Sequence, residues 1–281
     1  MATEIKSTPT PSWPTGVRLP VLLTFEHQSG EGAPLLPGDR PNYMVGGAMQ
    51  YGARRGIWNV LEVLDRLGVK ATFLVCGGTA EKYPDAVRAA YAAGHEIAGM
   101  SYGFDRVRTM SPEREQGVVR RTAKVLADVC GAQIKGWRCP DYRVSPQTLD
   151  ILSDEGFVWD SSLLNDDLPC WFDCTGGRLV EIPFTTSTAD KTFVGYPYPM
   201  RGGPDGLANV WEYEFDVLYR ESAQAPRFMI LSIQTWATGR PANLRTLRRF
   251  IERIKEHNDV SFVRCGELAG WCSQAPSPAQ N

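Results

Sequence analysis

Short apolar runs alternate along this chain with segments of helical period, and this alternation limits the fold more than any other feature. The apolar runs lie at residues 21–25, 71–75, 96–99, 134–137, 157–159, 179–182, 228–233 and 260–263. Helical segments between them include residues 51–67, 80–92 and 242–256. Strands that alternate with helices form parallel β/α units, so the sequence predicts an α/β fold built on an open sheet or a barrel.

The predicted helices carry the expected local signals. In the segment 51–67 one face is apolar, with Ile57, Val60, Leu61, Leu64 and Leu67. Ser111 and Pro112 have the residue types of a helix N-cap and first turn, and Ser145 with Pro146 repeats the pattern. These signals predict helices that begin near residues 111 and 145.

Composition excludes several classes of partner. The 281 residues include 30 Lys and Arg against 32 Asp and Glu, a formal net charge of −2. This balance gives no basic surface for nucleic acid or for an anionic membrane. The first fifteen residues are polar, and no apolar run approaches the ~18 residues of a membrane span. We therefore expect a cytoplasmic protein whose partner is a small-molecule substrate.

The distribution of strands and helices predicts one folded domain over residues 17–272. Residues 1–16 are expected to be a flexible N-terminal segment and residues 273–281 a disordered tail. Two long Gly- and Pro-rich interruptions, at 28–49 and 185–206, lie where a barrel places its active-site loops.

The seven cysteines are an odd and scattered set: Cys76, Cys130, Cys139, Cys170, Cys174, Cys265 and Cys272. Such a set suits free thiols in a reducing compartment better than a disulfide framework. The close pairs have no further ligands at the spacing of a zinc site. We therefore expect no metal at the cysteines.

Histidine is scarce, which limits the chemistry available to the chain. His257 lies near the end of a predicted helix, where a surface role is expected, and His95 opens a short strand, where a hydrogen-bonded structural role is expected. His27 is left, next to Glu26 at the end of the first strand. Successive strand residues face opposite ways, so both can line one site only if the strand has ended there.

Five short segments resemble the motifs of the polysaccharide deacetylase family. They are Thr24 to His27, Gly94 to Asp105, Trp137 to Pro140, Trp159 with Asp160, and Leu231 to Gln234. The resemblance implies a deformed (β/α) barrel of the polysaccharide deacetylase type, in which an aspartate and two histidines hold a metal at the C-terminal strand ends.

This chain departs from the family at the metal ligands. The resemblance puts His27 at the position of the aspartate, and Met100 and Phe104 at those of the two histidines. A thioether and a phenyl ring do not replace imidazole at such a cation. We therefore expect no metal and no other cofactor.

The remaining motif positions predict the catalytic residues. Glu26 falls at the position of the catalytic base, Arg138 at that of the motif arginine, and Gln234 at that of the catalytic histidine. We expect Glu26 to activate water, His27 to act as acid or orienting group, and Arg138 to stabilise an oxyanion. Met100 and Phe104 would then supply apolar surroundings that raise the pKa of Glu26. The alternative is that Glu26 is a structural carboxylate paired with Arg138.

A narrower resemblance covers residues 17–271 and is carried by the segments 51–58, 166–171, 182–185 and 239–242. These look like the deacetylase-like allantoinases and cyclic imidases, which hydrolyse an amide inside a small ring. Some members of that branch work without a bound metal. The resemblance also implies a homo-oligomer.

Further residues are candidates for contact with the substrate: Met100, Tyr102, Phe104, Asp105, Cys139, Asp166, Asp167, Trp171, Trp236 and Arg240. Several have other interpretations. Cys139 would be a nucleophile only if a base such as His27 contacted it. Asp166 and Asp167 precede Leu168 and Pro169 and fit a simple turn.

The leading hypothesis is therefore a metal-independent hydrolase that opens the amide bond of a small cyclic amide, ureide or imide. Because Gln234 stands at the place of the catalytic histidine, a metal-independent lyase, decarboxylase or isomerase in the same pocket is an alternative. A third is a catalytically inactive deacetylase-like binding protein. Sequence alone does not identify the substrate.

Overall fold

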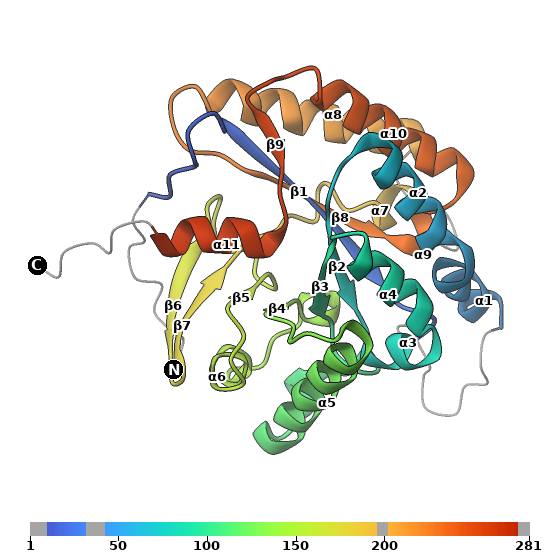
Figure 1. The fold of residues 1–281 in the computed structure, drawn as a ribbon, viewed down its shortest axis with the longest axis vertical. Coiled ribbons are helices and arrows are strands. Elements are labelled where there is room, and N and C mark those ends of the chain that lie inside the picture. Colours follow the sequence, from blue (N-terminus) through green and yellow to red (C-terminus); the bar gives the residue numbers. More distant parts are fainter. Residues whose placement is uncertain (1–9, 32–42, 196–201, 275–281) are drawn as a thin grey trace, which may run out of the picture.

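The computed structural model describes residues 10–31, 43–195 and 202–274, and these form a nine-stranded sheet (Figure 1). The strands are β1 (Leu19–His27), β2 (Thr72–Val75), β3 (Glu96–Gly99), β4 (Gly136–Trp137), β5 (Trp159–Asp160), β6 (Cys170–Cys174), β7 (Gly177–Glu181), β8 (Met229–Gln234) and β9 (Val260–Phe262). Their order is β6-β7-β5-β4-β3-β2-β1-β8, and β9 also pairs with β1.

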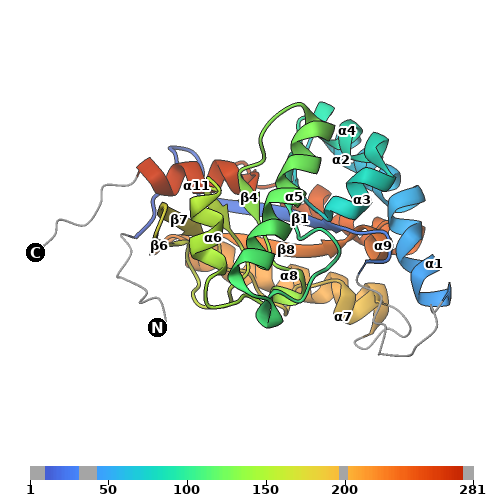
Figure 2. The ribbon, with the colours of Figure 1, turned by 90° about the horizontal axis from the view of Figure 1, so that it is seen from below.

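The sheet curls into an incomplete barrel, so the structure confirms the barrel and not a flat open sheet (Figures 1 and 2). Its strand pairs are parallel except β6 with β7, which form an antiparallel hairpin at one edge. β6 was not predicted, because its residues lack a distinct apolar run. Among the described residues no pairing joins β8 to the β6–β7 edge, so the barrel stays open there.

Helices surround the sheet (Figure 1). They are α1 (Tyr43–Tyr51), α2 (Ile57–Leu67), α3 (Gly77–Lys82), α4 (Pro84–Ala92), α5 (Pro112–Cys130), α6 (Thr148–Asp154), α7 (Lys191–Val194), α8 (Gly203–Glu221), α9 (Thr235–Thr238), α10 (Pro241–Ile254) and α11 (Cys265–Gln274). A π-helix, η1 (Gly52–Gly56), joins α1 to α2, and two short 3₁₀ turns are η2 (Val107–Thr109) and η3 (Pro140–Tyr142).

The helix predictions are correct in type and less so in extent. The helix predicted over 51–67 begins in α1 and contains the π segment. The helix predicted over 80–92 is divided at Tyr83, because Pro84 begins a new one. α5 begins at the predicted place after Ser111, whereas α6 begins only at Thr148, after Ser145.

The buried apolar side chains form two clusters, one between the sheet and the surrounding helices and one inside the barrel. Alternate residues of β1, including Val21, Leu23 and Phe25, pack outward against the surrounding helices. Leu22 points the other way, into a cluster with Met100 and residues of α11. Because β1 is buried on both faces, its sequence is a nearly continuous apolar run.

α11 closes the amino-terminal end of the barrel. Gly266 donates its backbone N–H to Glu96 at the start of β3 (2.9 Å), and Cys265 donates to Thr72 at the start of β2 (2.9 Å). The carboxyl ends of the strands therefore form the opposite mouth. No helix within the described ranges is long and apolar enough to span a bilayer. The first nine residues and the tail from residue 275 lie outside the description.

Candidate active site

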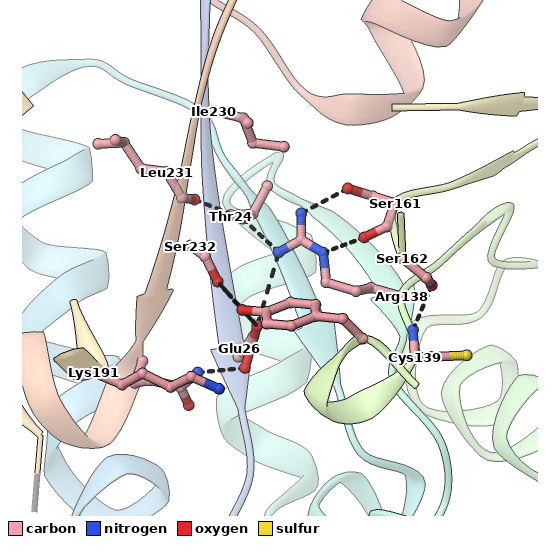
Figure 3. A network of polar contacts seen from close by, with 12 residues as sticks. Thr24, Glu26, Arg138, Cys139, Ser161, Ser162, Lys191, Ile230, Leu231 and Ser232 are labelled. Atoms are coloured by element: carbon pink, nitrogen blue, oxygen red, sulfur yellow. Dashed lines mark hydrogen bonds and ion pairs between the residues drawn. The ribbon is translucent and has the colours of Figure 1, made fainter. Parts of the chain in front are cut away.

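The strand ends bring three of the predicted catalytic residues together. Glu26 of β1 is paired in register with Gln234 of β8, and Arg138 follows Trp137 at the end of β4. Figure 3 shows the guanidinium of Arg138 directed toward the carboxylate of Glu26. The fourth predicted residue, His27, does not join them.

Three hydrogen-bond donors, two of them from β8, hold the buried carboxylate of Glu26, which is 3% exposed. Ser232 Oγ (3.0 Å) and Tyr142 Oη (3.2 Å) donate to Oε1, and Gln234 Nε2 donates to Oε2. Arg138 Nη1 lies 3.9 Å from Oε1. The carboxylate is therefore fixed in orientation by neutral donors, with one cation behind it.

Arg138 is fully buried, and other partners occupy its guanidinium (Figure 3). Its Nε and Nη2 donate to the backbone oxygen and hydroxyl of Ser161, each at 2.8 Å, and Nη1 donates to Thr24 Oγ1 at 2.9 Å. This environment suits a group that orients Glu26. It does not suit direct contact with an oxyanion of the substrate, because the guanidinium has no exposed surface.

His27 lies on the opposite side of β1 from Glu26. The strand continues through His27, so alternation turns this side chain toward the outer helices together with Phe25. Its Nδ1 contacts Thr235 Oγ1 at 3.1 Å, and Nε2 is buried with no partner among the described residues. Burial lowers its pKa to about 4. The expectation that both residues line the mouth is therefore wrong, because the strand has not ended.

The residues at the implied metal site do not fit a metal. Met100 is fully buried in the interior apolar cluster, and Phe104 packs against the same cluster. Neither side chain has a donor atom for a hard or borderline cation, and His27 faces the other way. Within the described ranges no group of three or more His, Cys, Asp or Glu side chains is arranged to hold a metal ion.

A tight turn takes the place of the implied ligand loop. Ser101 (φ 67°) and Phe104 (φ 61°) both have left-handed backbone, which is costly for residues other than glycine. Asp105 Oδ2 accepts hydrogen bonds from Ser101 Oγ (2.7 Å) and the Gly103 N–H (2.8 Å). Asp105, predicted to contact substrate, therefore stabilises this turn.

Tyr142 was missed by the sequence predictions. It and Asp141 both have left-handed backbone, with φ of 60° and 49°. The Tyr142 ring packs on Phe184 with centroids 3.7 Å apart, which directs its hydroxyl to Glu26 and Ser232. The sequence signal was Pro140-Asp141, a turn dipeptide that begins two residues after Arg138.

Asp190 is a second residue that the sequence predictions missed. It is fully buried and accepts the backbone N–H of Gln234 with both oxygens, at 3.0 and 2.9 Å, and the hydroxyl of Thr238 at 2.6 Å. Burial raises its pKa to about 7. Asp190 therefore sets the backbone position of Gln234, which contacts Glu26. The segment 185–206 was expected to hold active-site loops, and this residue lies in it.

Lys191 supplies a cation near the surface of the same region. Its Nζ lies 3.3 Å from Asp141 Oδ1 and 5.1 Å from the centroid of the Tyr142 ring. About a third of its side chain is exposed, at 33%. Unlike Arg138, Lys191 can therefore meet a ligand from solvent.

Cys139 is poorly placed to be a nucleophile. It is buried, and its backbone N–H donates to Ser162 Oγ at 2.8 Å (Figure 3). Burial, followed by the negative charge of Asp160, raises the pKa of its thiol well above the usual range. The base proposed to activate it, His27, faces away from the site, so the structure does not support a covalent mechanism.

Among the predicted substrate-contacting residues, Trp236 belongs to the network, whereas two others make surface contacts. Trp236 Nε1 donates to Gln234 Oε1 at 3.0 Å. The Tyr102 hydroxyl donates to Glu81 at 2.7 Å on the outer surface. The guanidinium of Arg240 lies 4.3 Å from the Tyr51 ring centroid.

Two of the remaining predicted contacts line a separate hollow of about 730 Å³. Asp166 and Asp167 line it. Asp166 Oδ1 accepts the backbone N–H of Asp167 at 2.7 Å, so these two residues form the turn given above as their alternative interpretation. Phe184 also lines the hollow, with its ring stacked on Tyr142. Trp171 lies on β6, with its ring centroid 5.9 Å from the guanidinium of Arg178.

Comparison with known proteins gives a consistent picture. The family model for polysaccharide deacetylase matches residues 41–158. The solved structure of PuuE allantoinase superposes with a TM-score of 0.86 at 29% identity, covering 96% of this chain and 95% of the other. A probable polysaccharide deacetylase from Pseudomonas aeruginosa PAO1 superposes with a TM-score of 0.86 at 27% identity, covering 95% of each chain. The peptidoglycan deacetylase of Helicobacter pylori is 23% identical over 243 residues, covering 76% of this chain and 82% of that protein. The deformed barrel predicted from the motifs is thereby confirmed.

Proposed function

The chain belongs to the polysaccharide deacetylase superfamily, and from this we propose that it hydrolyses a carbon–nitrogen bond in a small cyclic amide, ureide or imide without a metal. One observation carries the proposal. A buried carboxylate, Glu26, is oriented by Gln234, Tyr142 and Ser232 at the mouth of the barrel, where the implied ligand positions hold Met100 and Phe104. The likeness to PuuE allantoinase supports a ring amide as the substrate class.

Glu26 is the proposed base. Its Oε1 accepts from two hydroxyls, whereas Oε2 accepts from Gln234 alone among the described residues, which leaves a lone pair on Oε2 for a water molecule. Glu26 takes a proton from that water as the hydroxide attacks the ring carbonyl. The same carboxyl then returns the proton to the ring nitrogen as the C–N bond breaks. Water is consumed, and a carboxylic acid and an amine or amide nitrogen are formed.

The other groups have supporting roles in this proposal. Arg138 orients Glu26 from behind, and Asp190 holds the backbone of Gln234. Lys191 is proposed to stabilise the developing oxyanion, because its ammonium is accessible and lies near Tyr142. His27 has no part in proton transfer, since it faces the outer helices.

A second candidate is a lyase, decarboxylase or isomerase of the same metal-independent kind. The observation in its favour is that the partners of Glu26 among the described residues include no histidine that could act as an acid for a leaving nitrogen. Product mass separates the two, because hydrolysis adds one water and these reactions do not.

The test is an assay of ring opening by protein purified with a strong chelator, using hydantoins, allantoin and succinimides. We expect turnover that the chelator leaves unchanged. Glu26→Gln should lower kcat by about 10²- to 10⁴-fold, the usual contribution of a general base. Glu62→Gln is the matched control, because Glu62 is 58% exposed on α2.

Loss of turnover on chelation would contradict the metal-independent mechanism. Ligand-induced thermal stabilisation with no turnover would favour the inactive binding protein. Cytoplasmic location, the single domain and the homo-oligomer stay predictions.

A further inference from the structure

Two carboxyl groups lie fully buried beside Arg138, and the mechanism above does not use them. Asp160 of β5 and Glu181 of β7 are paired in register on neighbouring strands, and each is 0% exposed. Their side chains are within hydrogen-bond reach of each other. Glu181 Oε2 has no other partner among the described residues.

The charges around this pair do not balance if both carboxyls are ionised. The cation facing them from the end of β4 is Arg138, which also faces Glu26. The other titratable groups that face them are the thiols of Cys139, Cys170 and Cys174, whose pKa values are raised by burial. Two adjacent buried carboxylates cannot both stay charged beside one shared cation, so one of them must hold a proton.

Hydrogen bonds identify Asp160 as the charged member. Its Oδ1 accepts from Ser162 Oγ (2.8 Å) and its Oδ2 from the Ser162 N–H (3.0 Å), whereas the one described donor to Glu181 is the Leu163 N–H (2.9 Å). Donors favour the ionised form, so the proton is expected on Glu181. Burial, then the charge of Asp160, raises the pKa of Glu181 well above its usual range.

The pair fixes the segment that holds Arg138. Asp160 binds Ser162 and Glu181 binds Leu163, and between them Ser161 accepts two hydrogen bonds from the guanidinium (Figure 3). A change of charge in the pair would therefore reach Glu26 through Arg138.

We propose that Asp160 and Glu181 share one proton, carried by Glu181, and that this pair positions Arg138 behind Glu26. Loss of the shared proton at alkaline pH places a second negative charge beside Arg138 and draws the guanidinium away from Glu26. The positioning role rests on the proposed function of Glu26. The shared proton does not depend on it.

The proton is tested without a substrate. Infrared spectra of the wild-type protein should show the C=O stretch of a buried neutral carboxyl at pH 7, and this band should disappear as the pH is raised. Glu181→Gln keeps the shape and a donor to Asp160, so the band should be missing from this variant. Asp190→Asn is measured in parallel, because Asp190 can contribute a band of its own.

Unfolding gives a second, independent measure. The carboxyls of the unfolded chain are ionised at pH 7, so unfolding should release one proton more from the wild type than from Glu181→Gln. Glu252→Gln, 51% exposed on α10, should release as many protons as the wild type. Equal release by the wild type and Glu181→Gln, or a wild-type band that is lost in Asp190→Asn and fully retained in Glu181→Gln, would overturn the shared proton.

The positioning role is tested with a substrate found in the ring-opening assay. We expect the alkaline fall in kcat to shift to higher pH in Glu181→Gln, with KM unchanged. An unchanged kcat profile together with a missing infrared band would leave the proton established and refute the positioning role. Failure of the ring-opening assay itself would not affect the spectroscopic result.

Discussion

At the scale of single residues, the direction of a strand side chain decides between chemistry and structure. Glu26 and His27 are adjacent, yet one contacts Gln234 and Tyr142 inside the mouth and the other contacts Thr235 under the outer helices. Because β1 continues through His27, the two side chains must diverge. The histidine that was predicted to act as acid or orienting group is therefore a neutral structural residue.

This burial of His27 predicts a loss of stability in acid. Its pKa is about 4 in the folded protein and about 6.5 when unfolded, so the unfolded chain binds an extra proton between these values. The free energy of unfolding should therefore fall as the pH drops from about 6.5 to about 4, by up to ~3 kcal/mol for this residue. Urea unfolding across this range measures it.

In His27→Gln the free energy of unfolding should fall less between about pH 6.5 and about pH 4 than it does in the wild type. His95→Gln is a second case, because burial, followed by the charge of Lys70, lowers the pKa of His95 to about 4 as well. If neither substitution changes how the free energy of unfolding depends on pH in acid, these histidines are already protonated in the folded protein.

At the scale of elements, the π-helix η1 and the short helix α9 are packed almost backbone to backbone. A Cβ on Gly56 would lie 2.1 Å from the carbonyl oxygen of Thr235, and one on Gly52 would lie 2.8 Å from the backbone nitrogen of Trp236. α9 follows directly on Gln234. The glycines of η1 therefore allow the close approach that positions the start of α9 and, with it, Gln234.

Gly56→Ala should consequently be harmful. Overpacking of this kind costs about 1–3 kcal/mol, and the displaced α9 should also lower kcat. Gly117→Ala is the matched control, since Gly117 is inside α5 and an added Cβ meets nothing within 4 Å. That change should stabilise the protein by about 0.5–1 kcal/mol. Equal effects of the two substitutions on thermal unfolding would refute the packing explanation.

At the scale of the whole molecule, the barrel is open between β8 and the β6–β7 edge, and the chain after β7 fills part of this opening. Thr188 Oγ1 donates to the carbonyl oxygen of Ile230 at 3.1 Å, and the Asp190 N–H donates to that of Ser232 at 3.1 Å. Trp211 of α8 secures the segment from outside by donating to the Thr188 carbonyl at 2.8 Å. These bonds place Asp190 next to Gln234.

Trp211→Phe tests this connection. It removes the donor to a buried carbonyl, which should lower the free energy of unfolding by about 1–3 kcal/mol. We also expect a lower kcat, because Asp190 loses its fixed position. Trp58→Phe, at a residue 42% exposed, should change stability by no more than about 0.5 kcal/mol. Denaturant titration of both variants makes the comparison, and similar losses would contradict the proposed anchoring.

Much of the fold was predictable because its signals are local. The continuous apolar run of β1, the face of α2 and the start of α5 all reflect the side-chain period of a strand or helix. The boundaries of short strands such as β4 and β5 were not predictable, because they depend on pairing with neighbours that lie far away in the sequence.

The sequence by itself determined that this chain forms parallel β/α units, and its resemblance to the deacetylase motifs placed Glu26, Arg138 and Gln234 at the ends of strands, which meet at one mouth in a parallel barrel. Only the tertiary structure decided that His27 faces away from Glu26 and that Asp190, 44 residues before Gln234, holds its backbone. A strand's true end and a long-range hydrogen bond depend on the packing of distant segments, which no local pattern encodes.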